Sequence, residues 1–206
     1  MPNQVVNQNK SPDSRDREIL DCAALVFAEH GYRHTDVQEI ANRLGVGKGT
    51  VYRRFATKET LFLAAVDWGM QQLDRRVKEV YEAGKDDPYQ AIKAVFHEYL
   101  SFFDQNPEFV ELFSLERAEF KDRKKPTYAI YKEANAADWI AATEQLMDKG
   151  CFRKLPVEDV MEVANNLLYG TIFTGVFSGQ RRPMAEKADV MLDVLMNGLL
   201  SEPRKQ

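Results

Sequence analysis

Residues 35–55 read TDVQEIANRLGVGKGTVYRRF, and this segment is the most informative part of the chain. It predicts two short helices joined by a tight turn. Ala41 is small enough for two helices to touch, and Gly45, four positions later, suits a left-handed turn because it has no Cβ. Val51, six positions beyond Gly45, is the expected core anchor of the second helix. A helix-turn-helix of this kind places its second helix in the major groove of DNA while the first crosses the phosphate backbone.

The side chains of this stretch divide into an apolar inner face and a cationic outer face. We expect Thr35 and Gln38 to form a capping box, so that the first helix of the pair begins near Asp36. From Arg33 to Lys58 there are six Lys or Arg and two acidic residues, although the whole chain has a net charge of −4. A local basic excess of this kind favours DNA binding despite the acidic balance of the chain. The expected inner face is Ile40, Leu44, Val46 and Val51.

The longer segment ILDCAALVFAEHGYRHTDVQEIANRLGVGKGTVYRRFATKETLF, residues 19–62, resembles the DNA-binding domain of TetR-family transcriptional regulators along its whole length. The shared elements are GY, the Thr before the second helix, IA, GV, KGTVY, F and KE. Two features depart from the family pattern. Gly47 stands where the family usually has Ser, a change that costs a helix cap only a few tenths of a kcal/mol, and Arg53 or Arg54 stands where His is common. The base preference of these two arginines is therefore not inherited from the family.

Eight residues are the candidate DNA contacts. For phosphates we expect Thr35, Tyr52 and Lys58, because helix N-termini attract anions and a tyrosine hydroxyl can donate to a phosphate. The matching positions of TetR-like proteins usually contact the DNA backbone. The alternatives are core packing for Tyr52 and an ordinary solvated face for the two arginines. The candidates for base edges are Lys48, Gly49, Thr50 and Arg53, with Arg54 able to serve either role.

Helical signals continue along the remainder of the 206-residue chain, and no β-strand alternation of useful length occurs. Thr57 is expected to cap a long helix that ends near Gly84, and Asp87-Pro88 to open the next one. One further helix is expected to run from Tyr128 to Leu146. The predicted fold is all-α: a three-helix N-terminal DNA-binding domain joined by a long helix to a larger helical domain. The predicted bounds are a disordered arm at 1–13, the DNA-binding domain at 14–58 and the second domain at 59–202.

Composition narrows the class of protein further. The chain is 44% hydrophobic, which is enough for a core, and no apolar run approaches the roughly 20 residues needed to cross a bilayer. The N-terminal residues lack the apolar region of a signal peptide, so we expect a cytoplasmic protein with no membrane partner. The spacing of Cys22 and Cys151 argues against a disulfide framework. Lys10, Arg15 and Arg17, in or just after the polar arm, could reach a minor groove of DNA, but a solvated tail is the preferred interpretation.

The last two helices are apolar around most of their circumference, so each needs cover on more than one side. One cover is the rest of the fold, and the other is expected to be a second copy of the chain. Burial of both sides within one subunit is the alternative. DNA reading favours the homodimer, because one short recognition helix contacts few base edges and paired helices fit half-sites about 34–36 Å apart. The expected dimer interface is Val160, Ala164, Leu167, Leu168, Thr171, Met191, Leu192, Leu195 and Leu199.

The resemblance implies a repressor that binds a palindromic operator and is released by a small-molecule ligand, which we expect to be apolar or aromatic. The alternative is a helix-turn-helix DNA-binding protein that responds to a protein partner, or has an architectural role, and does not sense a small molecule. No HExxH, CxxC, P-loop or GxSxG signature occurs, so we expect no enzyme activity, no cofactor and no metal. Each ligand candidate also suits plain core packing. They are Trp68, Phe96, His97, Tyr99, Phe103, Phe113, Tyr128, Tyr131, Asn135 and Trp139, with Glu116 and Arg117 as further polar contacts.

Overall fold

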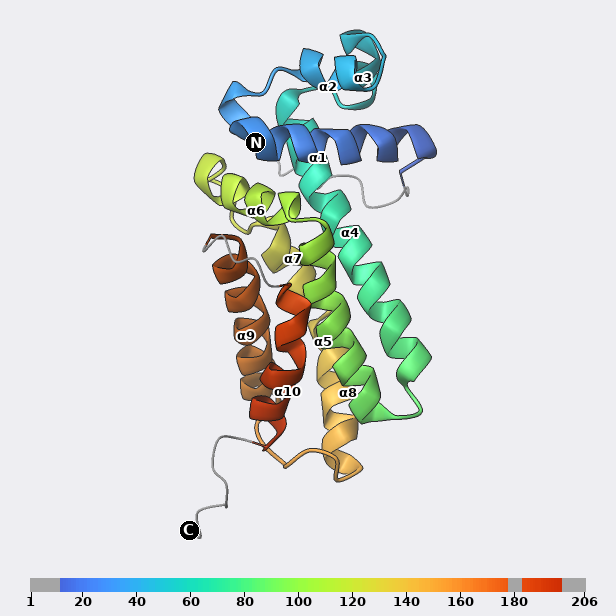
Figure 1. Ribbon diagram of the computed structural model, residues 1–206, viewed down its shortest axis with the longest axis vertical. Coiled ribbons are helices and arrows are strands. Elements are labelled where there is room, and N and C mark those ends of the chain that lie inside the picture. Colours follow the sequence, from blue (N-terminus) through green and yellow to red (C-terminus); the bar gives the residue numbers. More distant parts are fainter. Residues whose placement is uncertain (1–11, 178–182, 198–206) are drawn as a thin grey trace. The chain divides into compact units, whose positions relative to one another are not determined.

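The computed structural model describes residues 12–177 and 183–197, and within these ranges the secondary structure is entirely helical (Figure 1). The all-α prediction is confirmed, including an N-terminal helix-turn-helix followed by a larger helical part. Contacts divide the chain into two units. The first contains the described residues up to Gln72 together with Glu108–Ile130, and the second contains Leu73–Pro107 and the described residues from Tyr131 onward.

The first unit is built on α1, with the short helix α2 packed beside it, α3 packed on α2, and α6 packed against α1 (Figure 1). Its centre is aromatic: Phe62, which is fully buried, lies edge-on to Phe27 with ring centroids 5.0 Å apart. Phe120 stacks on Phe62 at 5.4 Å and meets Tyr32 at 4.9 Å. The helices of this unit are α1 (Ser14–His34), α2 (Val37–Arg43), α3 (Lys48–Arg54), the first half of α4 (Lys58–Gly84) and α6 (Glu108–Glu119).

The second unit holds α5 against α9, the 3-10 turn η1 and α10, while α8 packs on α9 (Figure 1). Asp104 of α5 accepts hydrogen bonds from the backbone amides of Met184 and Ala185 at 2.8 and 2.9 Å, which satisfies the start of η1. The elements are α5 (Pro88–Gln105), the second half of α7 (Thr127–Ala134), α8 (Ala136–Asp148), α9 (Val157–Phe177), η1 (Met184–Lys187) and α10 (Ala188–Asn197). The end of α4 and the last residues of α7 belong to this unit.

Two predicted caps are confirmed and one is wrong. Thr57 accepts a hydrogen bond from the Thr60 amide at 3.0 Å, and Asp87 accepts one from the Gln90 amide at 3.2 Å. Thr35 does not cap α2. The cap is Asp36, whose carboxylate accepts the Gln38 amide at 2.9 Å, because a carboxylate placed next to the first turn is at least as good an acceptor as a hydroxyl.

The helix expected from Tyr128 to Leu146 is two helices in the structure. α7 ends at Ala134 and α8 begins at Ala136, with Asn135 between them. The Asn135 side chain donates to the carbonyl of Tyr131 at 3.1 Å, one of the last carbonyls of α7. Asparagine often hydrogen-bonds nearby backbone groups in this way, which competes with a continuous helix. The apolar periodicity alone did not reveal the interruption.

The first unit is larger than the predicted DNA-binding segment of 14–58. It includes residues 59–72 of α4 and all of α6, because Phe62 and Phe120 complete the aromatic core that Phe27 begins. Among the described residues no helix is long and apolar enough to cross a membrane. Most of the predicted arm at 1–13, and the interface candidate Leu199, lie outside the described residues.

Candidate nucleic-acid interface

The turn between α2 and α3 depends on Gly45. Its φ is +64°, and a Cβ built there would meet nothing within 4 Å, so backbone conformation and not crowding requires glycine. The Gly45 amide donates to the Asn42 carbonyl at 3.1 Å, and the Val46 amide donates to the Ala41 carbonyl at 2.9 Å. Ala41 is fully buried, as expected for a point where helices touch. The turn therefore fixes the angle between the two helices.

Helix α3 is anchored by one residue and turns the others outward. Val51 is fully buried and is the buried residue of this helix. Gly47 occupies the cap position without a side-chain hydrogen bond, and its carbonyl accepts the Thr50 amide at 2.8 Å. The outward or partly exposed residues include every predicted base contact: Lys48, Gly49, Thr50 and Arg53. A seven-residue helix with one apolar contact and a cationic outer face is suited to enter a groove of DNA.

The three cations of α3 have different surroundings. Lys48 Nζ lies 2.7 Å from the Asp36 carboxylate, and this hydrogen bond raises the pKa of Lys48. Arg53 folds along its own helix, donating to the Gly49 carbonyl at 3.3 Å and the Thr50 hydroxyl at 3.1 Å. Among the described residues Arg53 forms no ion pair with a carboxylate. Arg54 instead bonds Asp13 and Asp16 at the start of α1.

The predicted phosphate contacts are placed unequally. Thr35 is buried, with 3% exposure, and donates its hydroxyl to the Gly31 carbonyl at 2.7 Å. Its side chain therefore does not face solvent, contrary to the role predicted for it as a phosphate contact. Tyr52 is 37% exposed, a placement that favours an outward role over core packing. Lys58 is the first residue of α4, and its Nζ lies 3.2 and 3.1 Å from the carbonyls of Arg33 and Thr35.

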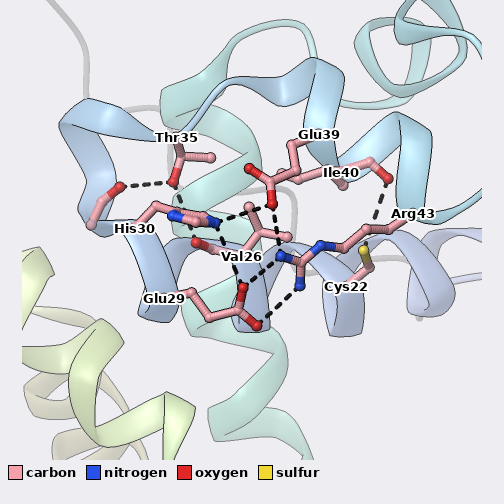
Figure 2. Close-up of polar contacts among 9 residues, drawn as sticks. Cys22, Val26, Glu29, His30, Thr35, Glu39, Ile40 and Arg43 are labelled. Atoms are coloured by element: carbon pink, nitrogen blue, oxygen red, sulfur yellow. Dashed lines mark hydrogen bonds and ion pairs between the residues drawn. The ribbon is translucent and has the colours of Figure 1, made fainter.

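A polar network joins the end of α1 to α2 (Figure 2). The Arg43 guanidinium bonds the carboxylates of both Glu29 and Glu39, and His30 Nε2 lies 3.1 Å from Glu39. The hydrogen bonds from Arg43 hold the pKa of both glutamates below the ordinary value of 4.5. Cys22 lies beside this network, with its Sγ 3.9 Å from the Ile40 carbonyl, and burial raises the pKa of its thiol. The network holds the first helix of the pair on α1.

The same network contains the one group of candidate metal ligands found among the described residues, Glu29, His30 and Glu39. Their ligand atoms lie within 4.8 Å of one another. Arg43 already supplies a positive charge to both carboxylates (Figure 2), so a metal ion would have to displace it. The arrangement fits an ion-pair network that fastens two helices.

The ligand candidates divide between the two units, and the polar ones have internal partners. Trp68 Nε1 donates to Asp21 at 2.7 Å, and Asn135 accepts from Lys78 at 2.8 Å. His97 Nε2 lies 2.9 Å from Asp189 of α10. Trp68, Phe113 and Tyr128 belong to the first unit, while Phe96, His97, Tyr99, Phe103, Tyr131, Asn135 and Trp139 belong to the second. In the second unit a small depression is lined by Tyr81, Lys85, Pro88, Ala91, Ala142, Gln145, Leu146 and Lys149.

The predicted interface face of α9 and α10 needs a correction. Leu168 and Leu192 are buried within the single chain, at 7% and 1% exposure, whereas Leu167 is exposed. Leu168 and Leu192 therefore pack on their own subunit and are not available to a second copy. Val160, Ala164, Thr171, Met191 and Leu195 are partly exposed. The exposed apolar residues of the two helices are Val163, Leu167, Tyr169, Phe177, Val190 and Val194.

The fold and the outward face of α3 define the class: a helix-turn-helix DNA-binding regulator. Comparison with known proteins identifies the family of the N-terminal domain. Residues 19–65 match the model described as bacterial regulatory proteins, tetR family. The matched segment spans most of α1, all of α2 and α3, and the first turns of α4, which are the elements that hold the candidate DNA contacts. Residues 19–65 therefore form a DNA-binding domain of the TetR family.

Relatives extend the similarity beyond the matched domain. The Fatty acid metabolism regulator protein of Bacillus subtilis strain 168 is 26% identical over 183 residues, covering 88% of this chain and 94% of the relative. The solved structure of the fatty acid degradation regulator FadR from Bacillus halodurans has a TM-score of 0.77 at 19% identity, covering 92% of this chain and 98% of its own. FadR from Bacillus subtilis, solved in complex with stearoyl-CoA, has a TM-score of 0.72 at 17% identity, covering 89% and 99%. At these identities the two solved structures show the fold.

Proposed function

We propose that this chain is a repressor that binds a palindromic operator as a homodimer and releases it when a long-chain acyl-CoA binds. The observation that carries the proposal is the outer face of α3, where Lys48, Thr50 and Arg53 surround a single buried anchor, Val51. These side chains can reach base edges in a major groove, and an arginine can grip a guanine with two hydrogen bonds. Tyr52 and Lys58 flank them as phosphate contacts.

Arg53 is the preferred base reader among the cations of α3. Its partners are the Gly49 carbonyl and the Thr50 hydroxyl, both neutral acceptors that a guanine can replace at low cost. Lys48 is held by Asp36, so DNA must compete with a carboxylate for it. We therefore assign sequence discrimination first to Arg53 and second to Lys48.

The homodimer is supported by the apolar surface of α9 and α10. Val190 is 65% exposed and Val163 is 50% exposed, and both lie on helices of the second unit. Exposed apolar side chains gathered on two helices are typical of surfaces that associate. A second copy is the preferred occupant because a two-fold dimer pairs two α3 helices for a palindrome. The proposed interface is centred on Val163, Leu167, Tyr169, Val190 and Val194.

The effector class is proposed from the relatives. The Bacillus subtilis relative that covers most of this chain is named a regulator of fatty acid metabolism, and the Bacillus subtilis FadR structure holds stearoyl-CoA. An acyl-CoA combines an apolar chain with an anionic head group, which agrees with the apolar ligand expected from the sequence. A ligand that prefers the form with low DNA affinity must, by linkage, be bound less tightly when operator is present.

The experiment begins with in vitro selection of duplexes from a random pool by the purified full-length protein. Fluorescence anisotropy then measures affinity for the selected duplex, with stearoyl-CoA, free CoA and stearate added separately. We expect a palindromic motif and release by stearoyl-CoA alone. A protein that selects no motif is no operator-binding regulator. A protein that selects a motif but ignores all three compounds is a DNA-binding regulator with another effector, or with a protein partner.

A further inference from the structure

Arg54, the last residue of α3, bonds the beginning of α1 across 41 positions of sequence. Its Nη1 lies 3.0 and 2.9 Å from the two carboxylate oxygens of Asp13, and the same nitrogen donates to Asp16. The Arg54 side chain is 33% exposed and that of Asp16 is 27% exposed, so this contact is partly shielded from water. A charge-assisted contact with two acids is stronger than a neutral hydrogen bond.

Asp13 is itself held in place by the backbone. Its Oδ1 accepts the Asp16 amide at 2.8 Å, which makes Asp13 the cap of α1. The hydrogen bond from Arg54 is the main reason that the pKa of Asp13 is lowered. A second contact fixes the same end of α1, because Arg17 Nε donates to the Pro12 carbonyl at 3.0 Å. Arg54 therefore bonds a carboxylate that also caps the backbone of α1.

We propose that Arg54 is a positioning residue that clamps the C-terminal end of α3 to the start of α1, with Asp13 and Asp16 as its partners, and that this clamp sets operator affinity. The inference rests on the proposed binding of DNA by α3. Arg53 and Arg54 are adjacent in sequence but have different roles: Arg53 has neutral acceptors and reads bases, whereas Arg54 has two acids and holds the helix. Arg54 is thereby withdrawn from the phosphate contacts.

If the clamp exists, removing the charges of Asp13 and Asp16 changes DNA affinity in the direction opposite to the one that charge repulsion alone predicts. Removing a negative charge near a DNA-binding face ordinarily strengthens binding, because repulsion of the phosphates is lost. If Asp13 and Asp16 hold α3 in place through Arg54, removing their charges weakens binding instead. The sign of the change in affinity therefore separates a clamp from a latent phosphate contact.

The test uses the full chain and the selected duplex, with the double variant D13N/D16N, the single variant R54A and the triple variant. Asparagine is as good a helix cap as aspartate, so D13N keeps the cap of α1 while removing its charge. We expect roughly three- to tenfold weaker binding for D13N/D16N, an unchanged dependence of affinity on salt concentration, and a triple variant no weaker than R54A. The matched control is E18Q, because Glu18 is an acid of α1 paired with Arg15 and not with Arg54.

Stronger binding by D13N/D16N with a steeper salt dependence would overturn the proposal, since it would mean that freed Arg54 contacts phosphates. Additive losses in the triple variant would also overturn it. Hydrogen exchange of the α3 amides without DNA provides a readout independent of operator binding. We expect faster exchange in α3 of D13N/D16N than in the wild type and in E18Q, and equal rates would overturn the clamp even if no duplex is bound.

Discussion

Arg33 and Glu119 form a two-point contact across 86 positions of sequence: Arg33 Nε lies 3.1 and 2.8 Å from the two carboxylate oxygens of Glu119. The contact joins the last turn of α1 to the last residue of α6. Tyr32 and Phe120 pack edge-on next to it. As a result α6 shares a core with the helix-turn-helix, although 53 residues separate the end of α3 at Arg54 from the start of α6 at Glu108.

We expect Glu119→Gln to lower the free energy of unfolding by less than about 1 kcal/mol, because Arg33 is 75% exposed and such pairs are screened by water. Urea denaturation measures this change. Glu82→Gln is the control, since Glu82 pairs with Lys85 on an exposed surface of the second unit. A loss above 2 kcal/mol for Glu119→Gln would mean that the ion pair, and not the aromatic core, holds α6 to α1.

Gly69→Ala is expected to destabilise the protein by about 1–3 kcal/mol, because overpacking strains a filled core. A Cβ at Gly69 would lie 2.3 Å from Cδ1 of Phe109, and the Phe109 side chain is only 2% exposed. Gly49→Ala is the matched control within the same unit. A Cβ there meets nothing within 4 Å, so the better helix former is expected to raise stability by up to about 1 kcal/mol. Thermal and urea unfolding compare the two, and equal effects would refute the packing argument.

The sequence predicted the helix-turn-helix well because its signals are local. The turn needs a residue with positive φ, and the two helices need small or apolar residues where they touch; both needs arise within about ten residues of sequence. Gly45 has positive φ, and Ala41 and Val51 are buried, as predicted. The pattern predicts Thr35 as the cap of α2, but the cap is Asp36. The two residues are adjacent, and either side chain suits a cap. Only the three-dimensional contacts show that Thr35 is buried.

Sequence patterns do not predict ion pairs between residues that are far apart in the chain. Nothing in the spacing of Asp13 and Arg54, or of Arg33 and Glu119, indicates that these charges meet, because ion pairs have no periodicity. The apolar faces of α9 and α10 were detected, but periodicity does not say which side packs on the same chain. Leu168 and Leu192, which the pattern places in the interface, are buried within the chain, whereas Leu167 of the predicted set is exposed together with Val163 and Val190.

The free energy of unfolding is expected to decrease as the pH is lowered below about 4.5, in part because of the Arg43 network. Arg43 holds the pKa of Glu29 and Glu39 below the ordinary value of 4.5. A carboxylate whose pKa is lower in the folded state stabilises the fold above its unfolded pKa, and this contribution is lost as pH falls through the folded pKa. Thermal unfolding from pH 7 to pH 3 should therefore show a shallower decline for Arg43→Gln than for the wild type. Parallel curves would contradict the network's role.

Arg53→Ala is expected to weaken operator binding by about 1–3 kcal/mol and to relax the base preference at one position of each half-site. Lys58→Ala should instead weaken binding to all duplexes similarly and reduce the salt dependence, as loss of a phosphate contact does. Anisotropy titrations against single-base variants of the operator, repeated at several salt concentrations, distinguish these results. Arg75→Ala is the control, because Arg75 lies on an exposed surface of α4 in the second unit. Unchanged affinity in both test variants would contradict the proposal that α3 contacts DNA.

Val190→Asp is expected to dissociate the proposed dimer, since it puts a charge on the most exposed apolar residue of α10. Sedimentation equilibrium measures the subunit mass, and operator affinity should fall together with it, because a monomer presents one recognition helix to a two-fold site. Asp193→Asn is the control, since Asp193 is an exposed residue of α10 that hydrogen-bonds Asn197 of its own helix. A Val190→Asp protein that remains dimeric would move the interface away from this face. A monomer that still binds the full operator with wild-type affinity would separate DNA recognition from dimerisation.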